Sequence, residues 1–171
     1  MYNKSEDEYL EEFETNYSDL EVEDYNVKFK EDLEKSLQEN FKIKIIMNQD
    51  LGNKARLNPI LFNRITENPF KLKERNYPVD FAYKRNNSFA LNLQIPETYK
   101  VTKLPENIAI SLPNKGGSFS LKSTQKGNTI NVYVRMIINK KIYSAIEYHT
   151  LKEFYKKIII AENSYIILEK K

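Results

Sequence analysis

The chain has 171 residues, 40% hydrophobic and 30% charged, which is enough to form a domain with a buried core. No run approaches the roughly 20 apolar residues of a membrane-spanning helix, and the acidic, polar Met1–Glu8 is not a signal peptide. The absence of cysteine excludes disulfides, thiolate nucleophiles and sulfur-ligated metal sites. We therefore expect a cytosolic chain or part of a longer exported protein.

Charge is unevenly distributed along the chain. Residues 1–40 hold 14 of the 24 acidic residues and 4 of the 27 basic ones, so their net charge is −10, which leaves +13 for the rest. Solvated surfaces explain such blocks without any partner. The basic residues 41–171 could also attract nucleic acid, so nucleic-acid binding is a further alternative function.

The first predicted element is a short acidic helix. Tyr9 and Phe13 have helical spacing, and Ser5 with Glu8 forms a capping-box pattern. A helix this short and weakly apolar is not stable alone. We interpret it as the end of a preceding domain.

Two strands are predicted next. Leu20–Lys30 alternates in hydrophobicity with a phase slip at Glu23–Asp24, which indicates a β-bulge or a crossing between sheets. Phe41–Met47 alternates without a slip, and Asp50–Asn53 has the composition of a turn.

All 6 prolines lie between Pro59 and Pro113, so this region is predicted to be short extended pieces joined by stiff corners. Apolar residues at 81–83 and 89–95 flank residues 84–88, which are predicted to form a hairpin turn. Strands are also expected at Ile108–Leu112 and from Phe119, and Lys126–Asn128 is a predicted turn.

The clearest strand is Thr129–Ile138, in which apolar residues occupy every second position. A corner at Asn139–Lys141 precedes a strand predicted over Ile142–Tyr148. The following helix has an apolar stripe at i, i+3, i+4, i+7 and i+8 from Leu151, and a capping box at Thr150 and Glu153. A closing strand is predicted at Tyr165–Leu168.

About eight to ten short strands with regularly spaced turns are typical of an all-β protein. We predict an antiparallel β-sandwich of the immunoglobulin or fibronectin type. It has a short N-terminal helix and one short helix near the C-terminus. The predicted domains are an acidic helical tail over residues 1–17 and a single sandwich over residues 18–171.

No catalytic, cofactor-binding or metal site is predicted. His149 is the only histidine, and no nucleophile elbow is present for a Ser-His-Asp triad. The acidic pairs Glu11–Glu12 and Glu23–Asp24 lack the spacing of a calcium loop. We therefore predict that the chain is not an enzyme.

The 12 tyrosines and 9 phenylalanines allow a second interpretation. Tyrosines on an exposed sheet face can stack on sugar rings. Such a binding face would be a contiguous aromatic patch larger than roughly a few hundred Å². An independent carbohydrate- or protein-binding module that uses exposed tyrosines is therefore the alternative function. Core packing explains the same count.

An ordered series of corners provides a family resemblance. The series begins with Leu57–Leu61, continues with Ile95–Tyr99 and the Gly116–Phe119 corner, and ends at Ile166–Lys171. The structural residues of the pattern are Asn58, Pro59, Asn68, Pro69, Phe70, Arg75, Tyr77, Pro78, Pro96 and Pro105. In this order the corners resemble the C-terminal domain of unknown function of bacterial transglutaminase-like proteins.

The resemblance implies a fold role and a set of partners. In this family a papain-like core precedes the C-terminal domain, often in exported proteins, and the C-terminal domain has no established activity. The implied function is a non-catalytic accessory β-sandwich domain with a structural or substrate-positioning role. The implied partners are the upstream core and a polypeptide or glycan. No nucleic acid, cofactor or membrane span is predicted. The implied location is periplasmic or extracellular.

Overall fold

The structure is a computed structural model that describes residues 5–17, 19–45 and 53–171. The chain forms two compact units, residues 1–51 and residues 52–171. The first unit contains two predicted strands together with the N-terminal helix. The division into domains at residues 17 and 18 stays a prediction, and each compact unit is described by itself below.

In the first unit, α1 (Glu6–Asn16) accompanies an antiparallel pair of strands, β1 (Leu20–Lys28) and β2 (Gln38–Ile45). The capping box at the start of α1 is confirmed. The Glu8 N–H donates to Ser5 Oγ at 3.2 Å, and the Ser5 N–H donates to Glu8 Oε2 at 2.9 Å. These bonds satisfy N–H groups that a helix leaves without intrahelical partners.

The predicted β-bulge is confirmed by a register shift between Val22 and Asp24. The Val22 N–H beside this bulge donates to the Glu14 carboxylate of α1 at 2.7 Å. The predicted end of the second strand and the turn that follows it fall largely on residues 46–52, which lie outside the described residues.

Aromatic side chains fasten α1 to the hairpin. The Phe13 ring stacks on the Phe41 ring with centroids 4.8 Å apart, and Tyr9 and Tyr25 pack at 5.8 Å. Both tyrosine hydroxyls donate to Glu39 Oε1, at 3.0 and 2.9 Å respectively. The aromatic residues of this part of the chain therefore form a small core.

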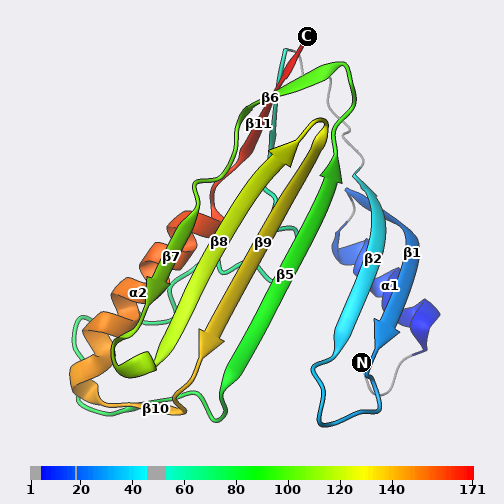
Figure 1. Ribbon diagram of the computed structural model, residues 1–171. Coiled ribbons are helices and arrows are strands. Elements are labelled where there is room, and N and C mark those ends of the chain that lie inside the picture. The colour runs from blue at the N-terminus through cyan, green and yellow to red at the C-terminus, as the bar shows by residue number, and fades with distance from the viewer. Residues whose placement is uncertain (1–4, 18, 46–52) are drawn as a thin grey trace. The chain divides into compact units, whose positions relative to one another are not determined.

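The second unit is built on a four-stranded antiparallel sheet (Figure 1). Its order is β5 (Arg85–Gln94), β9 (Thr129–Ile138), β8 (Gly117–Lys126) and β7 (Ile108–Ser111). A three-stranded sheet has the order β3 (Lys54–Leu57), β11 (Ile166–Lys170) and β6 (Tyr99–Lys103). A two-residue pair joins β4 (Val79–Asp80) to β10 (Ile142–Tyr143). The fold is mostly β, antiparallel and sandwich-like, as predicted.

Strand β9 lies between β5 and β8 and pairs with both along its full length. Ile130, Val132 and Ile138 are buried on one face, while Asn131 and Arg135 are exposed on the other. This alternation confirms the prediction from the sequence. Each buried aliphatic side chain contributes on the order of 1.5–3 kcal/mol relative to an exposed one.

One glycine is required where β8 begins. A Cβ at Gly117 would lie 2.5 Å from the Ile137 carbonyl oxygen of β9. A side chain at this position would separate the two strands. Close packing of β8 against β9 therefore requires glycine at position 117 of this corner.

Three sequence predictions were wrong in detail. Residues 85–88, expected in a hairpin turn, are paired with β9 as part of β5. The strand expected over Ile142–Tyr148 is only two residues long and is followed by a 3₁₀ turn at Ala145–Glu147. The capping box predicted at Thr150 and Glu153 is absent from α2 (Tyr148–Glu162). A capping box is formed instead by Ser144 and Glu147, at the 3₁₀ turn that precedes α2.

The apolar stripe predicted for α2 is confirmed. Its buried side chains are Tyr148, Leu151, Phe154, Tyr155, Ile158 and Glu162. The Phe70 ring meets the Tyr155 ring edge-on with centroids 5.0 Å apart, and Phe70 itself is buried. Helix α2 is therefore held by aromatic packing against the chain that precedes β4.

The connecting chain is residues 58–78, between β3 and β4. Two Asn-Pro corners fasten it to α2 by the same arrangement of hydrogen bonds. At the first corner, Asn58 Oδ1 accepts the Ile60 N–H at 2.8 Å, and Asn58 Nδ2 donates to the Glu162 carbonyl at 2.8 Å. At the second, Asn68 Oδ1 accepts the Phe70 N–H at 2.9 Å, and Asn68 Nδ2 donates to the Lys152 carbonyl at 2.9 Å. Each asparagine closes a local turn and also donates to a backbone carbonyl of the helix.

A buried acid lies at the C-terminal end of α2. Glu162 is 6% exposed, and its Oε2 accepts the Ile65 N–H at 2.7 Å. Burial raises the pKa of the Glu162 carboxyl, while the Ile65 N–H and the Arg64 charge act in the opposite direction. Glu162 therefore has a structural role in holding the connecting chain.

The corner geometry predicts the effect of Asn68→Ala. Both hydrogen bonds of the side chain are lost, so the free energy of unfolding should fall by about 1–3 kcal/mol. Urea denaturation of the full chain measures this. Asn87→Ala, at an exposed asparagine of β5, is the control and should change stability by less than about 0.5 kcal/mol. Equal effects of the two substitutions would refute this role for Asn68.

The raised pKa of Glu162 predicts a pH effect that Glu162→Gln removes. The folded wild-type chain retains its proton to higher pH than the unfolded chain does. Its stability should therefore fall as the pH rises from the ordinary carboxyl pKa through the raised folded value. Urea midpoints of both chains across this window provide the test. Parallel profiles would show that Glu162 does not titrate in this way.

In the first unit, burial and the Glu39 carboxylate raise the pKa of Tyr9 from 10.0 to about 12. Because the folded pKa is raised, the stabilisation is complete below pH 10 and is lost as the pH rises towards 12. Absorbance at 295 nm follows tyrosine ionisation. Glu39→Gln should move the titration of Tyr9 to lower pH, while Tyr155, whose pKa burial raises to about 12, should still titrate late. An unchanged titration curve would contradict the shared hydrogen bond.

Candidate functional site

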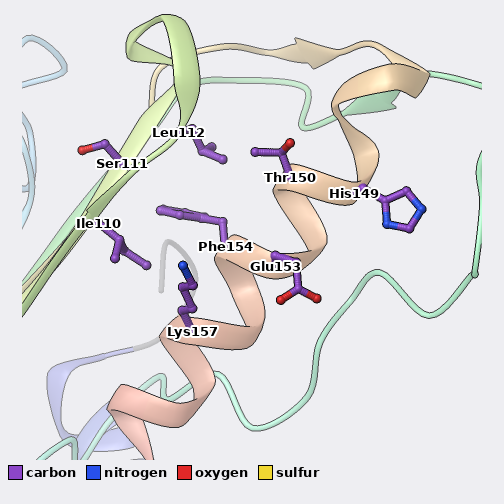
Figure 2. Close-up of a pocket in the computed structure, with 8 residues that line it drawn as sticks. All are labelled: Ile110, Ser111, Leu112, His149, Thr150, Glu153, Phe154 and Lys157. Atoms are coloured by element: carbon purple, nitrogen blue, oxygen red, sulfur yellow. The ribbon is translucent and has the colours of Figure 1, made fainter.

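A groove lies between β7 and α2 in the second unit (Figure 2). Its volume is about 360 Å³. Ile110 and Leu112 come from the β7 side, and the Phe154 ring extends from the helix towards them. The groove therefore has an apolar floor.

The polar groups at the rim do not form a nucleophile–base arrangement. Figure 2 shows the Ser111 side chain directed away from α2, and the His149 ring on the side of the helix away from β7. A Ser-His pair requires the two side chains within hydrogen-bond distance of each other. The groove does not bring these residues together.

Charges at the rim are solvent-exposed. Glu153 and Lys157 both line the groove, and Glu153 also lies 3.7 Å from Lys156 in an exposed ion pair. Exposed pairs of this kind contribute little energy. In the part of the chain that the structure describes, no group of three or more metal-ligating side chains is positioned to hold an ion.

The residues of the predicted corner pattern lie in turns and connections of the second unit. Pro59 is fully buried, and the Pro105 carbonyl accepts a hydrogen bond from buried Ser123 at 2.6 Å. Arg75 Nε donates to the Tyr77 carbonyl at 3.1 Å, just before Pro78 and β4. The Pro96 carbonyl accepts the Tyr99 N–H at 3.0 Å, and Pro69 is exposed next to buried Phe70.

Three tyrosines of the described chain are exposed, namely Tyr77 (77%), Tyr83 (62%) and Tyr133 (44%). They come from a loop, from the link between β4 and β5, and from the outer face of β9. Among the ring contacts that the structure describes, none joins two of them. The tyrosine-based alternative therefore gains no support from ring contacts.

Sequence reasoning missed the buried polar residues. Ser123, Tyr143 and Glu162 were not singled out, although all three use their polar atoms in the fold. Glu162 had a visible signal, because it continues the apolar stripe of α2 four residues after Ile158. The partners of the other two come from distant parts of the chain, so no local pattern identifies them.

Comparison with known protein families gave a match, which lies within the second unit. A family model described as "Domain of Unknown Function with solved-structure structure (DUF3858)" matches residues 53–168. No curated protein matches the chain. In the described residues, no helix is long and apolar enough to cross a membrane.

One solved structure shares the fold. It is named "crystal structure of a putative protease from Parabacteroides distasonis ATCC 8503". The match has a TM-score of 0.54 and 17% sequence identity, and it covers 68% of this chain. It covers 23% of the other chain, so this chain spans less than a quarter of the protein that it resembles. The family model covers most of the second unit, and the chain therefore belongs to the DUF3858 family.

Proposed function

We propose that this chain is a non-catalytic accessory β-sandwich of a longer transglutaminase-like protein, with a structural or substrate-positioning role. The observation that carries the proposal is the use of polar side chains in the second unit. Asn58, Asn68, Ser123, Tyr143 and Glu162 all bond to backbone groups that hold the fold. Catalytic groups need partners aimed at a substrate position.

The family resemblance and the comparisons support a place within a longer protein. The corner series that resembles the transglutaminase-associated domain lies in the region that the family model covers. The solved structure with the same fold is a chain of which this one matches 23%. In such an arrangement the chemistry belongs to another domain.

The name of that solved structure is compatible with a papain-like core. A thiolate nucleophile forms an acyl-enzyme, which water resolves in a protease and an amine resolves in a transglutaminase. This chain contains no cysteine and so lacks the nucleophile. The proposed partners are the core of the parent protein and its polypeptide or glycan substrate, and the proposed location is outside the cytoplasm.

The proposal predicts no turnover by the chain itself. The full chain is incubated with an acyl-donor protein and a fluorescent primary amine, and separately with a mixture of fluorogenic peptides. Amine incorporation and peptide cleavage should both equal those of buffer alone, because no activated nucleophile is available.

A matched variant separates true activity from contamination. His149→Ala removes the only histidine at an exposed position, so the fold should be retained. Turnover that the wild-type chain shows and His149→Ala lacks would overturn the non-catalytic proposal. A Cys-His-Asp core in the parent reading frame would support the transglutaminase-like assignment, and a parent protein without one would contradict it.

A further inference from the structure

The connecting chain, residues 58–78, is described throughout by the structure and contains no helix or strand. Connections of this kind that exceed roughly 12–15 residues are uncommon in compact domains, and many of them are functional, such as lids and binding loops. Hydrogen bonds at the two Asn-Pro corners fix residues 58–60 and residues 68–70. The segment between the corners, residues 61–67, is held in a different way.

Among the described hydrogen bonds, one joins residues 61–67 to the rest of the fold. The Ile65 N–H donates to Glu162 Oε2 at 2.7 Å. Glu67 also bonds to Lys71, but Lys71 belongs to the connecting chain itself. The corner bonds are made by asparagine amides, which do not titrate, whereas the bond to residues 61–67 is made by a carboxyl group, which does. Protonation can therefore act on this segment while the corners keep their bonds.

Two buried groups make the closed position of the segment costly. Burial raises the pKa of the Glu162 carboxyl above its ordinary value of 4.5. In the described part of the chain, Arg64 Nε is also buried and has no hydrogen-bond partner. An unpaired buried N–H costs free energy, which hydration on opening recovers. The contacts of the closed segment therefore have to offset the cost of both groups.

The charged groups around Glu162 come from the connecting chain and from β3. Arg64 acts on the carboxyl and favours its ionised form. Arg56 of β3 lies over the Tyr165 ring, 4.5 Å from its centroid, and no described interaction joins it to Glu162. One turn earlier in α2, the residues at i−4 and i−3 are isoleucines. Burial outweighs Arg64, so the closed segment favours the protonated carboxyl.

We propose that Glu162 is a protonation-controlled latch on residues 61–67. The segment is closed while the carboxyl is protonated. Ionisation favours an open form, in which water solvates the carboxylate and Arg64 Nε while the two asparagine corners stay in place. Opening also separates the Phe62 ring of the segment from the Phe89 ring of β5, which it meets edge-on with centroids 6.1 Å apart. The inference does not depend on the proposed function.

Hydrogen exchange of the full chain, followed residue by residue, tests the latch. The closed form has the raised carboxyl pKa and the open form has the ordinary one. The opening equilibrium should therefore rise about tenfold per pH unit from pH 4.5 up to the raised value. The Ile65 amide should show this rise after correction for the intrinsic pH dependence of exchange.

Urea separates local opening from global unfolding. Opening of residues 61–67 exposes little surface, so exchange of the Ile65 amide should not change at low urea concentrations. The Val132 amide of the central strand β9 exchanges by global unfolding and should respond to urea. Ile65 should also exchange at least about tenfold faster than Val132 after the same correction.

Two glutamine variants provide the controls. Glu162→Gln keeps an oxygen acceptor for the Ile65 N–H but cannot ionise, so the pH dependence of the opening should disappear. Glu67→Gln removes an exposed carboxyl of the same segment and should leave that pH dependence unchanged.

The wild-type chain alone can overturn the proposal. Local exchange of Ile65 without the pH dependence would do so. Exchange of Ile65 with the same rate and urea dependence as Val132 would also do so, because the opening would then be global. A pH dependence that persists in Glu162→Gln, or that is lost in Glu67→Gln, would contradict the assignment of the latch to Glu162.

Discussion

The second unit depends on the central position of β9. Its backbone is bonded on both sides, to β5 and to β8, and its apolar side chains are buried on one face. Water cannot take the place of β5 and β8 as hydrogen-bond partners of β9, because the buried N–H and C=O groups of β9 each need a partner within the sheet. The closely packed contact at Gly117, the buried face of β8 and the attachment of β5 all follow from the same strand.

Helix α2 and the connecting chain form the other support of this unit. The two asparagine corners join the connecting chain to carbonyls of the helix, and Phe70 places an aromatic ring against it. Buried polar groups are costly unless they are bonded. Because Asn58, Asn68 and Glu162 are bonded within the fold, they are poor candidates for chemistry. This is the physical basis of the proposed accessory role.

The sequence predicted those parts of the fold that depend on local periodicity. Strand β9 and the buried stripe of α2 were identified because alternation and helical spacing persist over many residues. The bulge near Asp24 was also visible as a phase slip. Residues 85–88 were misread, since their Arg-Asn-Asn-Ser sequence has the composition of a turn, and long-range pairing with β9 decides their conformation.

The predicted corner residues had a sequence signal, but their partners did not. An Asn-Pro pair indicates a turn, and nothing near Asn68 in the sequence identifies the Lys152 carbonyl as its acceptor. The order of the strands β3, β11 and β6 likewise joins segments far apart in the chain. Local patterns therefore predict helices, strands and turns. The hydrogen-bond partners that give residues such as Asn68 their structural roles come from distant parts of the chain.

Native-state hydrogen exchange tests the central claim that β9 organises the second unit. The account predicts that the amides of Val132 and Val134 exchange only on global unfolding of this unit and are among its slowest. Exchange of these amides by local opening, faster than that of the short edge strand β7, would contradict it.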